Sequence, residues 1–404
     1  MKRETLKTSG FACAALILAV AAAWVAPERH VPKILSDQGE LFYPNFTNPS
    51  AAKTIEVVDY DEATATARPF QVDLQRGRWV IPTHHNYPVD VSDRLLKTAA
   101  ALVELRKDVV VSDSAQDHSK HAVVDPLESK NTNLAGRGKR VTLRDLRKDI
   151  LADFIFGKPV EGKPGFRYVR VPGQKRTYAV KTDADPSARF TDWVRADLLR
   201  IPSASIRRVV INSYSIDERM GRLANLESLT LTQENSQWKA DGAERINTSA
   251  VATMAATLDR LKIVDVRPKP PALAEDLRSG TIRLTLDAAM SLRQRGFVLS
   301  PNGRLLANEG EMVVETSAGL VYGLRFGEVA TSGADTKPAA GAGENRYLLV
   351  TVNFDPARAA KWGEGSSTGA GIAKDLTNRY ADWYYVISNA DFQKLRLKRQ
   401  DVIR

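Results

Sequence analysis

Two groups of histidines are the residues of this chain best suited to chemistry. His84 and His85 are adjacent in the stretch GRWVIPTHHNYPVD, which ends at Asp90, and His118 and His121 lie three residues apart in DHSKHAVVDP. Imidazole next to a carboxylate is the usual material of general bases and of zinc sites. These stretches therefore raise two hypotheses, a catalytic loop and a metal site.

The metal hypothesis needs more ligands than the sequence offers. Residues three apart share a face on a helix, but the segment around His118 and His121 is polar and runs into Asp125-Pro126. No HExxH motif and no pair of cysteines accompanies the histidines. The catalytic hypothesis also lacks an identifiable nucleophile or substrate-holding group. We therefore predict no catalytic, metal-binding or cofactor-binding residues, and no cofactor.

A glycine-rich stretch formally matches the serine-hydrolase pattern G-x-S-x-G at residues 365–369, with Ser367 at its centre. In hydrolases this serine lies between a strand and a helix, whereas the flanks here are rich in glycine. A phosphate-binding loop is also excluded, because no Ser or Thr follows Lys374. We interpret residues 331–345 and 363–375 as mobile Gly/Ala/Ser-rich loop insertions.

The N-terminal residues predict where the chain lies in the cell. Residues 1–9 form a net-positive leader, and residues 10–27 contain no charged side chain. That length fits a single transmembrane anchor, and a cleaved signal segment remains the alternative. The leader's basic residues would keep the N-terminus in the cytoplasm. We expect a linker over 28–43 and a single-pass inner-membrane protein whose bulk is extracytoplasmic.

The composition narrows the function classes further. The only cysteine, Cys13, lies in the apolar segment, so the exported part has no disulfide framework and no thiol nucleophile. Gly10 stands where a lipobox requires a Leu-like residue. The net charge is +10, but the basic residues are spread along the chain, and the densest stretches, 137–148 and 394–404, are interpreted as solvated faces. We predict no nucleic-acid partner.

The chain contains two similar halves. Residues 74–111 and 231–266 each show a polar turn, a Trp (Trp79 and Trp238), a polar loop and an amphipathic helix. Four apolar helix positions correspond at a constant offset of 156: Leu95, Ala99, Leu102 and Leu105 with Val251, Ala255, Leu258 and Leu261. Candidate N-caps precede both helices: Asp90 or Ser92 in the first, Asn247 or Thr248 in the second. The second loop contains no histidine, so we interpret His84 and His85 as a local variation.

A second pair of matching stretches follows in the same order. Phe156-Gly157-Lys158 corresponds to Phe326-Gly327-Glu328, and Arg167-Tyr168 to Arg346-Tyr347. The short alternating runs around them are typical of antiparallel strands. We predict an α+β fold of two tandem β-rich repeat modules, residues 44–209 and 210–404, each with one amphipathic helix, after an N-terminal transmembrane helix.

Several of these blocks carry a family resemblance. The block RGRWVIP…YPVDVSDRLLKTAAAL, the AVVDP turn, IFGKPVEGKPGFRYVRVPGQKRTYAV, RGFVLSPNGRLLANEGEMVVETSAGLVYGLRFGE and DWYYVISNADFQKL resemble the bacterial domain-of-unknown-function family 4340. The resemblance implies one N-terminal transmembrane helix, a repeated extracytoplasmic region and an association with the auxiliary part of ABC-type transport systems of the gliding-motility kind. It implies no catalytic residues.

The expected function is therefore that of a membrane-anchored extracytoplasmic binding or scaffold protein. It would be an auxiliary, non-enzymatic subunit of an ABC-type export or motility complex, with permease and ATPase subunits or an envelope polymer as partners. Two alternatives stay open. One is an extracytoplasmic hydrolase using His84, His85, His118 and His121, and the other is passive binding of anionic lipid or wall polymer through the basic faces.

Overall fold

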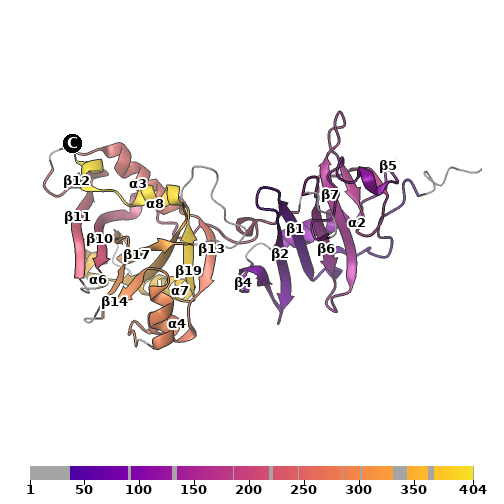
Figure 1. The fold of residues 1–404 in the computed structure, drawn as a ribbon. Helices are drawn as coiled ribbons and strands as arrows, with labels where there is room; N and C mark the ends of the chain where they lie inside the picture. Colours follow the sequence, from indigo (N-terminus) through magenta and orange to yellow (C-terminus); the bar gives the residue numbers. More distant parts are fainter. Residues whose placement is uncertain are drawn as a thin grey trace, which may run out of the picture.

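The computed structural model describes residues 37–89, 92–129, 134–184, 186–217, 222–243, 245–283, 285–300, 303–330, 344–362 and 368–403. They form two lobes, each built on one large sheet of antiparallel strands (Figure 1). The predicted mixed α and β class is thus confirmed. The leader and the apolar segment 10–27 lie outside the described residues, among which no helix is long and apolar enough to cross a bilayer.

The first lobe contains a nine-stranded sheet. Its order is β4-β3-β2-β1-β6-β7-β8-β9-β5, with β1 (Thr54–Asp61), β2 (Thr66–Gln75), β3 (Arg78–Ile81), β4 (Tyr87–Pro88), β5 (Val109–Ser112), β6 (Lys139–Arg144), β7 (Ile150–Pro159), β8 (Phe166–Arg170) and β9 (Thr177–Lys181). Helix α2 (Ser92–Val103) joins the core of this lobe through its buried apolar side. Single 3-10 turns lie at Pro49–Ala51 (η2), Pro82–His84 (η3), Ala115–Asp117 (η4) and Phe190–Asp192 (η5).

The second lobe contains an eight-stranded sheet. Its order is β12-β11-β10-β16-β17-β18-β19-β13, with β10 (Ile206–Asp217), β11 (Arg222–Glu234), β12 (Gln237–Ala240), β13 (Ile263–Pro268), β16 (Glu311–Thr316), β17 (Leu320–Val329), β18 (Arg346–Phe354) and β19 (Trp383–Ile387). A separate hairpin pairs β14 (Phe297–Leu299) with β15 (Leu305–Ala307). A 3-10 turn at Ser203–Ser205 (η6) precedes β10, and the predicted boundary between residues 209 and 210 falls inside that strand.

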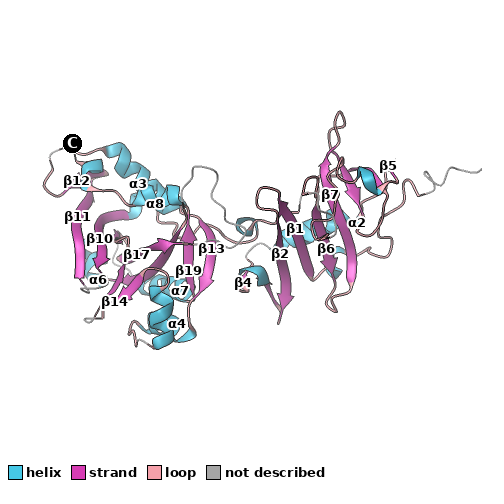
Figure 2. Ribbon diagram, viewed as in Figure 1, coloured by secondary structure: helices cyan, strands magenta, loops and turns pink. Residues whose placement is uncertain are grey.

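Most helices belong to the second lobe (Figure 2). They are α3 (Thr248–Arg260), α4 (Pro271–Ser279), α5 (Leu286–Arg293), α6 (Pro356–Lys361), α7 (Thr368–Ala381), α8 (Asn389–Leu395) and α9 (Arg399–Val402). The prediction of one amphipathic helix per half is therefore wrong for the second half. The additional helices lie in the longer connections between β13 and β16 and on either side of β19. Their short apolar stripes cover more of the sheet.

The two sheets have the same strand order. The first sheet runs β3-β2-β1-β6-β7-β8-β9-β5, and the second runs β12-β11-β10-β16-β17-β18-β19-β13, so the strands correspond one to one in these orders. Among the described residues, β4 is the strand of the first sheet that has no counterpart in the second. All eight helix-region residues matched at the offset of 156 are buried, as predicted. Leu96, the neighbour of Leu95 in the same helix, faces away from the core and is 47% exposed. Asn247 caps α3, accepting from the backbone N–H of Ala250 at 3.3 Å, and Asp90 lies outside the described residues.

The matched glycines Gly157 and Gly327 occupy equivalent places in their sheets. A Cβ on Gly157 would lie 2.2 Å from the carbonyl oxygen of His121, and one on Gly327 would lie 2.1 Å from that of Arg295. The residue after each glycine donates its N–H to that same carbonyl, Lys158 at 3.3 Å and Glu328 at 2.9 Å. In each sheet, a loop therefore approaches so closely that only glycine fits.

The loops that meet these glycines also match in detail. Ala122 and Gly296, which follow the accepting residues, both have left-handed backbone angles, with φ of 54° and 78°. The ring of His121 lies 4.4 Å from that of Tyr168, and the guanidinium of Arg295 lies 5.7 Å from the ring of Tyr347. The Arg-Tyr match read from the sequence thus corresponds to one shared packing arrangement.

One loop prediction needs correction. Residues 368–375 of the predicted loop 363–375 belong to helix α7, which continues to Ala381, whereas 331–343 and 363–367, including Ser367, lie outside the described residues. The helix forms because Ala373, Leu376 and Tyr380 make an apolar stripe that packs into the core. Gly369 lets it approach, since a Cβ there would lie 2.3 Å from the ring of Phe354.

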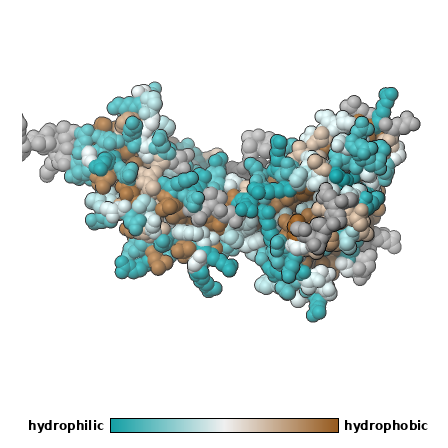
Figure 3. Space-filling model, turned by 180° about the vertical axis from the view of Figure 1, so that it is seen from behind, coloured by the Kyte–Doolittle hydropathy of each residue, from teal (hydrophilic) through white to brown (hydrophobic). Residues whose placement is uncertain are grey.

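On the face shown in Figure 3, hydrophilic side chains and apolar patches are interspersed over both lobes. Part of the basic stretch 137–148 is structural rather than only solvated. Lys148 pairs with buried Asp73 at 2.5 Å, and Arg140 pairs with buried Asp153 at 2.6 Å. These residues therefore hold the first sheet together, because a buried carboxylate needs a cation and hydrogen-bond donors.

Candidate functional site

The His84 loop lies where the two lobes meet. The ring of His84 stacks on Phe190 with centroids 4.6 Å apart, and its Nε2 lies 3.9 Å from a carboxylate oxygen of Asp265 on β13 of the second lobe. Tyr87, from the same loop, packs against Trp383 of β19 at 4.9 Å. The comparison of the two halves of the sequence, which interpreted His84 as a local variation, did not reveal this contact between the lobes. The histidine-free loop of the second half instead contacts its own lobe, where Asn247 donates its N–H to the carbonyl of Val402 at 2.7 Å.

Burial lowers the pKa of His84 to about 4, against the opposing attraction of Asp265. A neutral, stacked ring with its Nδ1 3.2 Å from the hydroxyl of Thr83 is a packing group. His85 is exposed, with a left-handed backbone (φ 58°). The geometry thus favours a structural role for His84.

We expect the junction to weaken in acid because of His84. Its pKa is lower in the folded protein than the usual 6.5, so the unfolded chain binds more protons and stability falls as the pH drops from about 6.5 to 4. The full effect is about 3 kcal/mol. His84→Phe keeps the stacking and removes the titration. Denaturant unfolding at pH 7.5 and 4.5 should therefore show a smaller acid loss in this variant than in wild type; equal losses would contradict the assignment.

The second pair of histidines is not brought together as a metal site. His118 Nε2 lies 2.8 Å from the carbonyl oxygen of Lys175, and His121 is buried against Tyr168. Among the described residues no group of three or more His, Cys, Asp and Glu side chains could hold a metal ion. His118 and His121 instead fasten the loop that follows β5.

Lys269 is the most deeply buried amine of the described residues. Burial lowers its pKa to about 7. Its Nζ donates to the carbonyl oxygens of Tyr380, at 2.8 Å, and Trp383, at 2.5 Å, and lies 5.2 Å from the ring centre of Tyr384. The first carbonyl belongs to the last turn of α7, where a cation is favourable. This geometry makes Lys269 a helix-capping group.

The strongest candidate site is a polar pocket of about 670 Å³ in the first lobe. It lies between the loop after β5 and the strands β6 and β8. Its lining residues are mostly polar or charged: Ala115, His118, Val124, Asp125, Leu127, Glu128, Arg140, Arg170, Gly173, Gln174 and Lys175. A concave site with a few fixed polar groups is the usual form of a ligand pocket.

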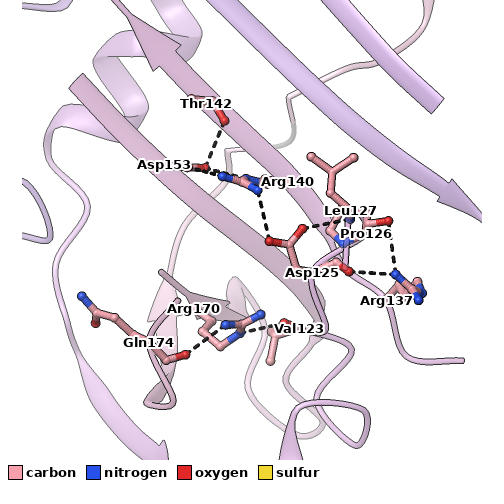
Figure 4. Close-up of polar contacts among 10 residues, drawn as sticks. All are labelled: Val123, Asp125, Pro126, Leu127, Arg137, Arg140, Thr142, Asp153, Arg170 and Gln174. Atoms are coloured by element: carbon pink, nitrogen blue, oxygen red, sulfur yellow. Dashed lines mark hydrogen bonds and ion pairs between the residues drawn. The ribbon is translucent and has the colours of Figure 1, made fainter. Parts of the chain in front are cut away.

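Arg170, at the end of β8, is the central residue of this pocket. Its side chain donates from Nε to the carbonyl of Val123 at 2.8 Å and from Nη1 to the carbonyl of Gln174 at 2.9 Å (Figure 4). The residue is only 4% exposed, and no carboxylate lies within ion-pair distance of it among the described residues. Burial lowers the pKa of its guanidinium, although Asp125 and Glu128 partly oppose this.

The wall opposite Arg170 is a fixed network. Asp125 accepts from Nη1 of Arg140 at 3.1 Å and from the backbone N–H of Leu127 at 2.9 Å (Figure 4). Arg140 also donates to both oxygens of Asp153, from Nε at 3.0 Å and from Nη2 at 2.6 Å. Thr142 adds a hydrogen bond to Asp153 at 3.0 Å. The pocket is preorganised, because each of these side chains is held by partners other than a ligand.

Sequence reasoning assigned Arg170 only to a strand. The sequence did contain a signal for Arg170. The match of Arg167-Tyr168 with Arg346-Tyr347 aligns Arg170 with Leu349 of the second half. A charged residue at a position that is apolar in the other half is a reason to look for a site. The burial of Arg170 and its missing acidic partner became visible only in three dimensions.

A family model described as a domain of unknown function, DUF4340, matches residues 79–278. No curated protein and no solved structure matches the chain. The matched region includes the polar pocket and both sides of the His84–Asp265 contact.

Proposed function

This chain belongs to the DUF4340 family through residues 79–278, and from that premise we propose that it is a membrane-anchored extracytoplasmic binding and scaffold protein. It would be an auxiliary subunit of an ABC-type export or motility complex. The uncharged segment 10–27 after a basic leader supports an inner-membrane anchor with the bulk of the chain outside the cytoplasm. Permease and ATPase subunits are the proposed partners.

The proposal includes an internal duplication, with both lobes derived from one module. Its support is the shared strand order of the two sheets and the matching glycine contacts of Gly157 and Gly327. Duplicated modules let one copy keep the structural role while the other acquires a binding surface. The numerous helices cover the second sheet, whereas the first lobe carries the open polar pocket.

The pocket around Arg170 is the observation that carries the binding function. Its walls are fixed by Arg140, Asp125 and Asp153, and its volume of about 670 Å³ is suited to a small ligand or a short partner segment. The sequence rival, a hydrolase using the histidines, has less support. His84 is buried in the lobe junction, and His118 and His121 fasten a loop.

Mild detergent extraction followed by affinity purification of the full chain tests this function. We expect permease and ATPase subunits to co-purify, and recovery of the chain alone would contradict the proposal. The alternative function, a hydrolase, is tested with a variant in which His84, His85, His118 and His121 are all replaced by alanine. If a cellular phenotype of the deletion is rescued by this folded variant, the hydrolase is excluded. Envelope-polymer binding that weakens with salt, without subunits, would favour the passive alternative.

A further inference from the structure

We propose that the pocket around Arg170 binds a carboxylate group of a small polar ligand, with the guanidinium of Arg170 as its anchor. This inference rests on the proposed function, in which the first lobe is the binding module, and it names the class of ligand. The register of the two sheets, the unused donors of Arg170 and the charges that face the pocket all support a carboxylate ligand.

The second sheet shows what the fold itself requires at this place. In the first sheet Tyr168 pairs with Ala179, and Arg170 pairs with Thr177. In the second sheet the matching Tyr347 pairs with Val386, so Leu349 and Tyr384 stand where Arg170 and Thr177 stand in the first.

Leu349 and Tyr384 are both completely buried and belong to an apolar cluster with residues of α4 and α5. A sheet of this architecture therefore accommodates an aliphatic side chain at the position of Arg170 and a tyrosine, whose hydroxyl lies 3.1 Å from that of Ser291, at the position of Thr177. The first lobe has a guanidinium in place of Leu349, and burying such a group is costly. Arg170 lines the pocket, so we attribute this charged side chain to a ligand rather than to a requirement of the sheet.

Arg170 retains donors for such a ligand. A guanidinium has five N–H donors, and the side chain gives one from Nε to Val123 and one from Nη1 to Gln174. Both hydrogens of Nη2 and one of Nη1 have no acceptor among the described residues. The planar fork matches the two oxygens of a carboxylate, and such bidentate pairs are among the strongest hydrogen-bonded contacts.

The surrounding charges favour a single negative charge over two. Arg140, Arg170 and Lys175 are balanced by three carboxylates, those of Asp125, Asp153 and Glu128. A phosphate dianion would place two negative charges near Asp125 and Glu128, whereas a carboxylate places one. The same two acidic side chains can accept hydrogen bonds from hydroxyl or ammonium groups of the ligand. The pocket therefore fits a carboxylate that carries hydrogen-bond donors.

Titration calorimetry on the purified full chain in detergent tests the inference with four probes. D-glucuronate combines a carboxylate with hydroxyl donors, and L-glutamate combines carboxylates with an ammonium group. Inorganic phosphate, in a buffer basic enough to make it the dianion, carries two negative charges, and D-glucose lacks a charge. We expect saturable binding of glucuronate or glutamate. The tighter-binding probe of the two shows whether Asp125 and Glu128 accept from hydroxyl or from ammonium groups of the ligand. No saturable carboxylate binding, or tighter binding of phosphate, would overturn the inference.

Variants link the binding to Arg170. Arg170→Leu copies the residue found at the matching place in the second lobe and should weaken carboxylate binding at least tenfold, with the melting temperature reporting its fold. Arg170→Lys keeps the charge but loses the fork, and exposed Lys175→Gln leaves the core untouched; both should also weaken binding. Lys163→Gln, an exposed lysine outside the pocket, is the matched control and should bind like wild type. Equal binding by wild type and the folded Arg170 variants would refute the assignment.

The two proposals fail separately. Carboxylate binding without co-purifying subunits would leave the pocket assignment standing and remove the transport-complex function. Co-purification of the subunits without binding of any carboxylate probe would remove the pocket assignment and leave the transport-complex function standing. Loss of co-purification in Arg170→Leu would show that the ligand group belongs to a partner subunit.

Discussion

Trp193→Ala is expected to lower the free energy of unfolding by about 4 kcal/mol. Trp193 is completely buried, its indole N–H donates to the carbonyl of Ser187 at 3.0 Å, and its ring lies 5.9 Å from that of Phe70 in the first sheet. Truncation removes a large apolar surface and leaves that carbonyl without its donor. The loss should appear as a lower midpoint in urea or guanidinium unfolding.

The effect should extend beyond the first lobe, because the segment after Trp193 holds both lobes. Leu198 donates its N–H to Leu261 at 2.8 Å, and its carbonyl accepts from the hydroxyl of Tyr380 at 2.9 Å, both in the second lobe. Trp362→Ala, the same change at a half-buried site, is the control and should cost less than half as much. Similar losses in the two variants would refute this account of the connecting segment.

Alanine at Gly157 or Gly327 is expected to destabilise the protein by about 3 kcal/mol in each case. The added Cβ would lie 2.2 Å from the His121 carbonyl oxygen in the first case and 2.1 Å from that of Arg295 in the second. Both obstacles are backbone atoms, which cannot move without breaking the hydrogen bonds of Lys158 and Glu328. Thermal melting of the purified variants measures the losses.

Gly371→Ala is the matched control for these substitutions. Gly371 lies inside helix α7, and a Cβ there would meet no atom within 4 Å. Alanine is the better helix former by up to about 1 kcal/mol, so this variant should be slightly more stable than wild type. A loss from Gly157→Ala or Gly327→Ala no larger than 0.5 kcal/mol would show that the loops do not need their close approach.

The lobe junction gives the proposed scaffold a defined geometry. His84 and Tyr87 of the first lobe contact Asp265 and Trp383 of the second, and the connecting segment adds hydrogen bonds. An anchored protein that presents a pocket to membrane partners benefits from such a fixed arrangement, because less order has to be imposed on binding. Acid should loosen this arrangement through His84.

The periodic features of the chain could be read from the sequence. The apolar stripes at Leu95 to Leu105 and Val251 to Leu261, the cap at Asn247 and the Phe-Gly match all depend on local spacing, and spacing is visible without coordinates. The α+β class follows from the same patterns. The helix at 368–381 was missed because its glycines were read as flexibility, although Gly369 provides close packing against Phe354.

What only the tertiary structure decided is how distant residues meet. His84 lies 181 positions before Asp265 in the sequence, and only folding shows that the histidine belongs to a junction and not to a reaction. Arg170 looks like one of many basic residues until its burial beside Val123 and Gln174 is seen. Local spacing thus predicted the helices α2 and α3, the α+β class and the likeness between the halves, whereas the membrane segment stays a prediction. Burial and pairing, which depend on contacts across the whole chain, decided which polar side chains form a site.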